Sequence, residues 1–316
     1  MAAPTVDGGA AKGAPAAGGP DGAPPDGAPP DRGAVRAKRK GLLVRLTVAP
    51  LVLGVVLALL WWHDASGSSA PTDVVLALMG GAAAYEACAT LARAGRRLPV
   101  ATVVVACAAL SGLGLVAPHD AALRGTLRSL VLAGAVVAIF VAHLRTVREG
   151  DLDRLLAAFF PVVFVGYCFG LVREVGDGPL GARALALVIV TAKASDIGGW
   201  IVGKTLGRHR MIPSVSPGKT WEGTIGGLLF SAGAGVAVLA ATGPLPGLAT
   251  TSLEAAVLGV LLGAASILAG LCHSAFKRRC AVKDSSSLLP EMGGILDMID
   301  SLVLAAPVAL LWLTAR

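Results

Sequence analysis

The stretch that decides the fold runs from residue 253 to residue 314 and reads LEAAVLGVLLGAASILAGLCH, then SAFKRRCAVKDSSSLLPEMGG, then ILDMIDSLVLAAPVALLWLT. Its first and last parts are apolar runs of about 20 residues, the length at which an α-helix crosses the hydrocarbon core of a bilayer. The middle part is basic and rich in turn residues. Carboxylates are costly inside a membrane, so Asp297 and Asp300 at the mouth of the last apolar run indicate a metal or substrate site.

Apolar runs of this kind recur along the chain. Hydrophobic residues make up 55% and charged residues 15% of the 316 residues, and the mean hydropathy is +0.73, which excludes an ordinary soluble domain. Lipid admits only helices and closed barrels, and these runs are too long and continuously apolar for barrel strands. We therefore predict an all-α, polytopic integral membrane protein with about nine transmembrane helices, near residues 42–62, 73–93, 98–117, 126–145, 155–173, 180–203, 223–243, 253–273 and 295–314.

The chain divides into three parts by composition. Residues 1–40 are nearly all Ala, Gly, Pro and Asp without apolar periodicity, which predicts a disordered tail. Residues 41–190 hold N-terminal transmembrane helices, and residues 191–316 hold the predicted catalytic region. Lys and Arg concentrate in every second loop, which predicts a cytoplasmic N-terminus in the inner membrane. The loops near 204–222 and 274–294 then both face the cytoplasm.

The loop from residue 203 to residue 223 contains a misleading motif. Gly198, Gly203, Lys204 and Thr205 match the G-x-x-x-x-G-K-T pattern of a phosphate-binding loop. That motif needs a preceding strand, whereas here it lies in and at the end of an apolar helix. The glycines are better explained as a small-residue packing face between helices.

The second half of that loop is more informative. Ser216, Lys219 and Thr220 surround Pro217-Gly218 and supply hydroxyls and a cation. Glycine lets backbone N–H groups approach an anion closely, and lysine acts as a point charge. The residues alone leave two interpretations open, an anion-binding loop and a basic loop on the membrane surface.

Four aspartates are candidate site residues. Asp196 lies in a predicted helix one turn after Lys193, and is either half of an internal ion pair or a site residue. Asp297 and Asp300 share one helix face. Helix capping would need only one of them, and with Asp284 they could hold Mg²⁺. His209 and His273 flank the two loops and could contact phosphate. Glu86, inside the second apolar run, is either a hydrogen-bond partner of another helix or a contact of a lipid headgroup.

With these residues identified, the chain resembles the phosphatidate cytidylyltransferase family. The resemblance is carried by the C-terminal half, in Ser274, Lys277-Arg278, Lys283-Asp284, Leu289-Pro290, Gly293-Gly294 and Asp297-x-x-Asp300, with Ser216-Pro217, Lys219 to Gly223 and Asp196. The chain departs from the family pattern at Gly270 and His273, where the family commonly has acids, and at Met292 and Met298. The departures are consistent with a divergent active member, a shifted substrate or an inactive relative.

The resemblance implies that CTP and phosphatidic acid give CDP-diacylglycerol and pyrophosphate at the cytoplasmic face of a lipid bilayer. It implies one or two Mg²⁺ ions on Asp284, Asp297 and Asp300, with Asp196 as a further candidate. Lys283 belongs with these aspartates to the implied catalytic set. Phosphate and nucleotide contacts are implied for Ser216, Lys219, Thr220, Ser274, Lys277 and Arg278. No nucleic acid partner is expected, and a homodimer is allowed. The alternatives are a polyprenol kinase-type CTP-dependent enzyme and a non-catalytic transporter.

Overall fold

The computed structural model describes residues 54–63 with gaps at 57 and 60, residues 65–144, 151–177, 181–286 and 293–315. Seven helices among these residues are long and apolar enough to cross a membrane. They coincide with seven of the nine predicted runs, which confirms an all-α, polytopic membrane protein. Most of the predicted run 42–62, and all of residues 1–40, lie outside the described residues.

The element order follows the predicted runs closely. The elements are α2 (Ala70–Arg93), α3 (Val100–Ser111), η1 (Leu113–Leu115), α4 (Ala121–Leu144), α5 (Asp151–Phe160), η2 (Pro161–Phe169), α6 (Val172–Val175), α7 (Gly181–Thr205), β1 (Arg210–Ile212), β2 (Ser216–Thr220), α8 (Trp221–Thr242), α9 (Ser252–Arg279) and α10 (Ile295–Thr314). Together α5, η2 and α6 form one membrane-length segment, in which the π-helix η2 begins at a proline.

The prediction of a full transmembrane helix over 98–117 is wrong in its length. The helix there, α3, has 12 residues and ends at Ser111, so it is only about 18 Å long at 1.5 Å per residue. Gly166 and Gly170 of the neighbouring segment press closely against it, since an added Cβ at Gly170 would lie 2.7 Å from the carbonyl oxygen of Leu110. A short α3 therefore packs tightly within the protein, where hydropathy alone predicted a longer helix.

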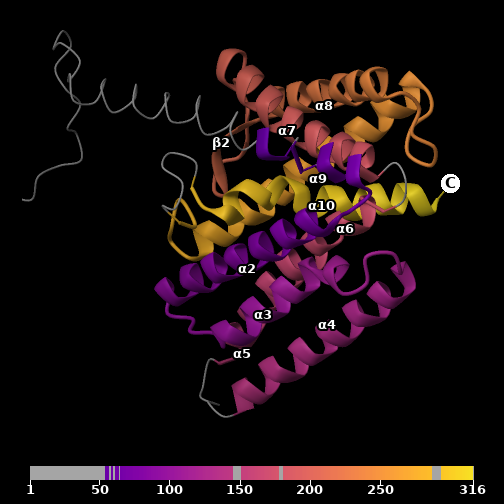
Figure 1. Ribbon diagram of the computed structural model, residues 1–316. Coiled ribbons are helices and arrows are strands. Elements are labelled where there is room, and N and C mark those ends of the chain that lie inside the picture. Colours follow the sequence, from indigo (N-terminus) through magenta and orange to yellow (C-terminus); the bar gives the residue numbers. More distant parts are fainter. Residues whose placement is uncertain are drawn as a thin grey trace, which may run out of the picture. The chain divides into compact units, whose positions relative to one another are not determined.

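The C-terminal helix α10 lies at the centre of the packing. It contacts α9, α7, α2, η2 and α6, and Figure 1 shows it between α2 and the group formed by α7, α8 and α9. Leu296, Ile299, Val303 and Ala306 are fully buried and lie at the spacing of one helix face. This buried face fixes α10 in the protein and thereby fixes the two aspartates of its first turns.

Small residues bring α7 and α8 into close contact. A Cβ added at Gly198 would lie 2.4 Å from the Phe230 ring, and one added at Gly227 would lie 2.7 Å from the Ser195 carbonyl oxygen. Gly198, Gly203 and the residues around them are helical in α7, and no strand precedes them among the described residues. The structure confirms the small-residue packing face and rejects the phosphate-binding loop.

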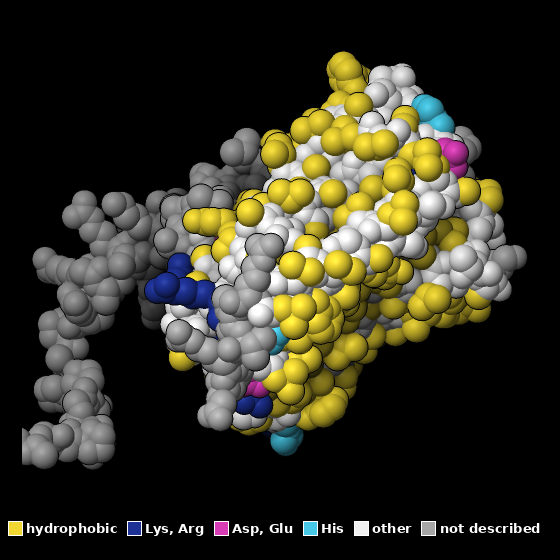
Figure 2. Space-filling view, turned by 90° about the horizontal axis from the view of Figure 1, so that it is seen from below, with side chains coloured by type: hydrophobic (Ala, Val, Ile, Leu, Met, Phe, Trp, Pro, Cys, Tyr) yellow, Lys and Arg dark blue, Asp and Glu magenta, His cyan; other side chains and the backbone are white. Residues whose placement is uncertain are grey.

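The described parts of four basic loops, within residues 93–97, 151–154, 204–222 and 274–285, meet at one end of the helices. Their connecting hydrogen bonds run from Arg93 to the Ser285 carbonyl at 3.5 Å, from Arg154 Nε to the Arg97 carbonyl at 2.5 Å, and from Arg278 Nε to the Val215 carbonyl at 3.3 Å. Figure 2 shows a largely hydrophobic face with Lys and Arg side chains gathered toward one edge. The loops that the charge pattern assigned to one side of the membrane are therefore neighbours in the fold.

A buried ion-pair network includes three arginines at the opposite end of the helices, Arg124, Arg128 and Arg173. It joins Arg124 to Glu174 and Asp177, Arg128 to Glu174, and Arg173 to Asp73 and Asp177. Three arginines face three acids, so this end carries little net charge from them.

Candidate active site

The first turn of α10 presents Asp297 to a dense set of hydrogen-bond donors. Its Oδ1 accepts from Lys277 Nζ at 2.6 Å, and its Oδ2 accepts from the backbone N–H of Gly294 at 3.0 Å. The backbone N–H and the hydroxyl of Ser285 also donate to Oδ2. Asp297 therefore caps α10 and ties together α9, the segment after α9 and α10.

A second carboxylate reaches the same helix end from the N-terminal half of the chain. Glu86 on α2 is 6% exposed, and its Oε2 accepts the backbone N–H of Leu296 at 2.9 Å. Gly294 makes room for it, because an added Cβ there would lie 2.1 Å from Oε2. The sequence drew attention to Glu86 as a carboxylate within an apolar run but gave no partner for it. In the structure Glu86 caps the helix that carries both site aspartates.

Asp300, one turn further along α10, faces α9. His273 is fully buried, and its Nδ1 lies 3.1 Å from Asp300 Oδ2 and 3.9 Å from Asp297 Oδ1. The imidazole lies beside the Phe276 ring, which stacks on Phe160 at 4.2 Å between ring centroids. His273 therefore faces both aspartates of α10, and the contact with phosphate that the sequence suggested stays a prediction.

The hairpin of β1 and β2 forms the other side of the site. A cavity of about 280 Å³ is lined by Asp196 of α7 and by Ser216, Lys219 and Thr220 of β2. Thr220 also caps α8, since its Oγ1 accepts the backbone N–H of Gly223 at 3.1 Å. The structure thus brings Asp196 together with three residues of β2, and the N-terminus of α8 opens toward them.

Each carboxylate of the site has a cationic or imidazole neighbour. Lys193 lies 3.9 Å from Asp196, Lys277 lies 2.6 Å from Asp297, and His273 lies beside Asp300. Burial lowers the pKa of the Lys219 ammonium, while the nearby charges of Asp196 and Asp300 act in the opposite direction. Lys219 therefore lies within the field of two acids, although it makes no direct ion pair with either.

Four other predicted residues lie further from this centre. Lys283 and Asp284 are exposed, and no hydrogen bond or ion pair between described residues joins them to Asp297 or Asp300. Ser274 Oγ donates within α9 to the Gly270 carbonyl at 2.7 Å, and Arg278 reaches the hairpin through Val215. Leu289, Pro290 and Met292 lie outside the described residues.

The predicted metal set is not gathered into one cluster. Among the described residues, no three His, Cys, Asp or Glu side chains are placed to hold a metal ion. The oxygens of Asp297 already accept hydrogen bonds from Lys277, Ser285 and Gly294. Asp196 and Asp300 are less occupied by donors, and two carboxylates completed by substrate phosphates fit the way in which proteins bind Mg²⁺.

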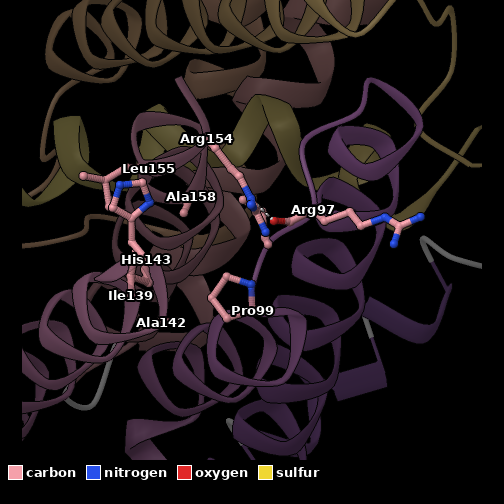
Figure 3. Close-up of a pocket in the computed structure, with 9 residues that line it drawn as sticks. Arg97, Pro99, Ile139, Ala142, His143, Arg154, Leu155 and Ala158 are labelled. Carbon is pink, nitrogen blue, oxygen red and sulfur yellow. Dashed lines mark hydrogen bonds between the residues drawn. The ribbon is translucent and has the colours of Figure 1, made fainter. Parts of the chain in front are cut away.

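A separate cavity lies at the same end of the helices. It has a volume of about 210 Å³ and lies between the α2–α3 connection, the end of α4 and α5 (Figure 3). Arg154 and His143 border it, and Ile139, Leu155 and Ala158 give it an apolar lining. None of the predicted site residues lines it, so it is distinct from the site around Asp297.

Curated proteins of known sequence are similar to parts of this chain. A phosphatidate cytidylyltransferase of Pseudomonas aeruginosa is 44% identical over 172 residues, covering 47% of this chain and 60% of that protein. One of Haemophilus influenzae is 40% identical over 138 residues, covering 40% of this chain and 44% of that protein. The uncharacterized protein YnbB of Escherichia coli is 38% identical over 128 residues, covering 40% and 41%. The chain thus spans about half the length of the curated relatives it matches. The family model described as "Cytidylyltransferase family" matches residues 43–315, and the chain belongs to that family.

Proposed function

We propose that the protein is a phosphatidate cytidylyltransferase, which transfers the cytidylyl group of CTP to phosphatidic acid. The observation that carries the proposal is the convergence of Asp196, Lys219, Lys277, Asp297 and Asp300 at the end of the helices where the basic loops meet. A phosphate oxygen of the lipid attacks the α-phosphorus of CTP, the bond to the β-phosphate oxygen breaks, and pyrophosphate leaves. Because the nucleophile is already an anion, the site mainly has to position and neutralise charge.

The hairpin and α9 supply the groups that would hold the phosphates. Lys219 and the hydroxyl of Ser216 line the cavity beside the N-terminus of α8, where unpaired backbone N–H groups favour an anion. Lys277 stays beside Asp297, which keeps the ammonium directed at the site. Arg278 and Lys283 are exposed and form an outer ring of positive charge that attracts CTP from solution.

A divalent cation is part of the proposal. Bound Mg²⁺ would offset negative charge on the triphosphate during transfer. We assign it to Asp196 and Asp300, with Asp284 able to approach when substrate binds. Asp297 would act chiefly by holding Lys277, Ser285 and the start of α10.

The placement also suits the two substrates. The site lies at the ends of membrane-length helices, so acyl chains can stay in the bilayer while CTP arrives from water. The cluster of basic loops favours the cytoplasmic face for this end, by the positive-inside rule. The enzyme would accordingly be a multi-pass protein of the inner membrane with its site in the cytoplasm.

The test is pyrophosphate release by the purified protein in lipid–detergent micelles with CTP, phosphatidic acid and Mg²⁺. We expect release that requires all three and falls at least a hundredfold in Asp300→Asn. Asp153→Asn is the matched control, because Asp153 is exposed and lies outside the site. Equal rates in the wild type and Asp300→Asn would refute the assignment.

The lipid acceptor distinguishes this enzyme from a CTP-dependent lipid kinase. A cytidylyltransferase releases pyrophosphate and needs a lipid phosphate, whereas a kinase releases CDP and needs a lipid alcohol. Replacing phosphatidic acid with diacylglycerol or a polyprenol should therefore abolish pyrophosphate release and produce no CDP. CDP formation with either alcohol would overturn the proposed reaction.

A further inference from the structure

His273 occupies an unusual position for a histidine in a membrane protein. It is fully buried on α9 and faces the two aspartates of α10 across the helix contact. The family pattern commonly has an acid at this position. An acid there would be a third carboxylate beside Asp297 and Asp300, whereas the imidazole offers a hydrogen-bond donor instead.

The hydrogen-bond geometry fixes which nitrogen carries the proton. An ionised carboxylate only accepts, so the contact of 3.1 Å between Nδ1 and Asp300 Oδ2 requires a proton on Nδ1. The other nitrogen, Nε2, is buried and has no hydrogen-bond partner among the described residues. An unsatisfied buried polar atom is costly, so packing alone does not account for an imidazole at this position.

The ring is also held rigidly. Phe276 lies beside it with ring centroids 6.3 Å apart, and Phe276 in turn stacks on Phe160 of α5. Asp300 therefore receives its hydrogen bond from a donor whose direction is set by three packed rings. The same donor is 3.9 Å from Asp297, too far for a hydrogen bond, so it acts on Asp300 selectively.

We propose that His273 is a positioning residue, whose Nδ1–H holds the Asp300 carboxylate in the orientation that binds the divalent cation. This proposal rests on the proposed function for the identity of the cation site. Groups that orient a ligating side chain through a hydrogen bond commonly change metal affinity 10–100-fold when they are removed.

Two substitutions of the same residue separate the nitrogens. In His273→Asn the amide nitrogen can replace Nδ1, and in His273→Gln it comes to lie near the position of Nε2. The measurement is Mn²⁺ binding to the purified protein by EPR titration, with CTP present and lipid absent, because substrate phosphates complete the cation site. We expect His273→Gln to weaken Mn²⁺ binding roughly tenfold or more, and His273→Asn to stay within about threefold of the wild type.

A further variant guards against a general loss of structure. Phe276→Leu keeps the imidazole but removes the aromatic ring that packs beside it. This variant should weaken Mn²⁺ binding by about threefold, less than His273→Gln does. Equal Mn²⁺ affinity in the Asn and Gln variants, a larger loss in Asn, or no Mn²⁺ binding in the wild type would each overturn the proposal. If the expected order holds but no pyrophosphate is released, the proposed function fails and the positioning role stands. If pyrophosphate release is normal but Mn²⁺ affinity is unchanged in His273→Gln, the positioning role fails and the proposed function stands.

Discussion

Removing the carboxylate of Glu86 should disable the site from a distance. Glu86→Ala leaves the buried backbone N–H of Leu296 without its acceptor. A hydrogen bond to a charged group contributes about 1.5–3 kcal/mol, and an anion at a helix N-terminus adds about 0.3–1 kcal/mol. Part of this is offset because a buried carboxylate no longer has to be desolvated. We expect a net loss of about 2 kcal/mol, concentrated in the turn that carries Asp297 and Asp300.

The assay compares stability with activity. At about 2–4 °C per kcal/mol for a chain approaching this size, the Tm in detergent at a fixed scan rate should fall by roughly 6 °C. The kcat of pyrophosphate release should fall by at least tenfold, because the first turn of α10, which carries the site aspartates, would fray. Glu86→Gln keeps an acceptor and should lose about half as much stability. Tyr85→Phe, on the exposed side of the same helix, is the control. An alanine variant with wild-type Tm and kcat would refute the capping role.

Three further predictions address separate parts of the fold. Gly294→Ala should reproduce the kinetic defect of Glu86→Ala, because its Cβ would lie 2.1 Å from the carboxylate; a wild-type kcat would contradict the close contact. Asp73→Ala should lower stability by about 3–5 kcal/mol by leaving buried Arg173 without this partner, with recovery in Asp73→Leu/Arg173→Met, as followed by thermal unfolding. Because burial lowers the pKa of Lys219, its charge is lost at a lower pH than that of a free lysine. KM for CTP should therefore rise with pH below ~10.4, and Lys219→Arg should suppress that rise.

Run length and charge pattern predicted most of the fold because membrane helices are dictated by local hydropathy. Seven runs became helices, and the loops selected by Lys and Arg content contact one another. The length of α3 was missed because the apolar run continues past Ser111, where the helix ends before Gly112. Its close contacts with Gly166 and Gly170 are likewise not encoded in hydropathy. Local composition was thus sufficient for the architecture but not for the tightest helix contact.

The site was predictable in its residue types and much less so in its pairings. Asp297 and Asp300 were identified by their spacing, yet the partners of the site carboxylates come from other helices. Glu86 reaches a backbone N–H that is 210 residues away in sequence, and no local pattern reports such a contact. His209 lies 2.6 Å from Glu222, a partner 13 residues away that the sequence did not indicate. Sequence spacing indicates which residues share one helix face, whereas this site is built from residues of several helices and a strand.

The missing acid at position 270 can be tested by restoring it. A Cβ added at Gly270 would lie 3.1 Å from Lys219 Nζ, which donates to the Ile267 carbonyl at 3.2 Å. A carboxylate at this position would pair with Lys219 and neutralise it. The ammonium would then repel a divalent cation less and attract triphosphate less, so Gly270→Asp should tighten Mn²⁺ binding and raise KM for CTP. A change of about 1.4 kcal/mol in each would make both effects roughly tenfold. The asparagine of Gly270→Asn has the size of aspartate without its charge, so this variant should change neither Mn²⁺ binding nor KM for CTP. Two outcomes would refute the reasoning that the glycine leaves Lys219 charged. One is equal effects of Gly270→Asp and Gly270→Asn, and the other is a change of the affinities for Mn²⁺ and CTP in the same direction.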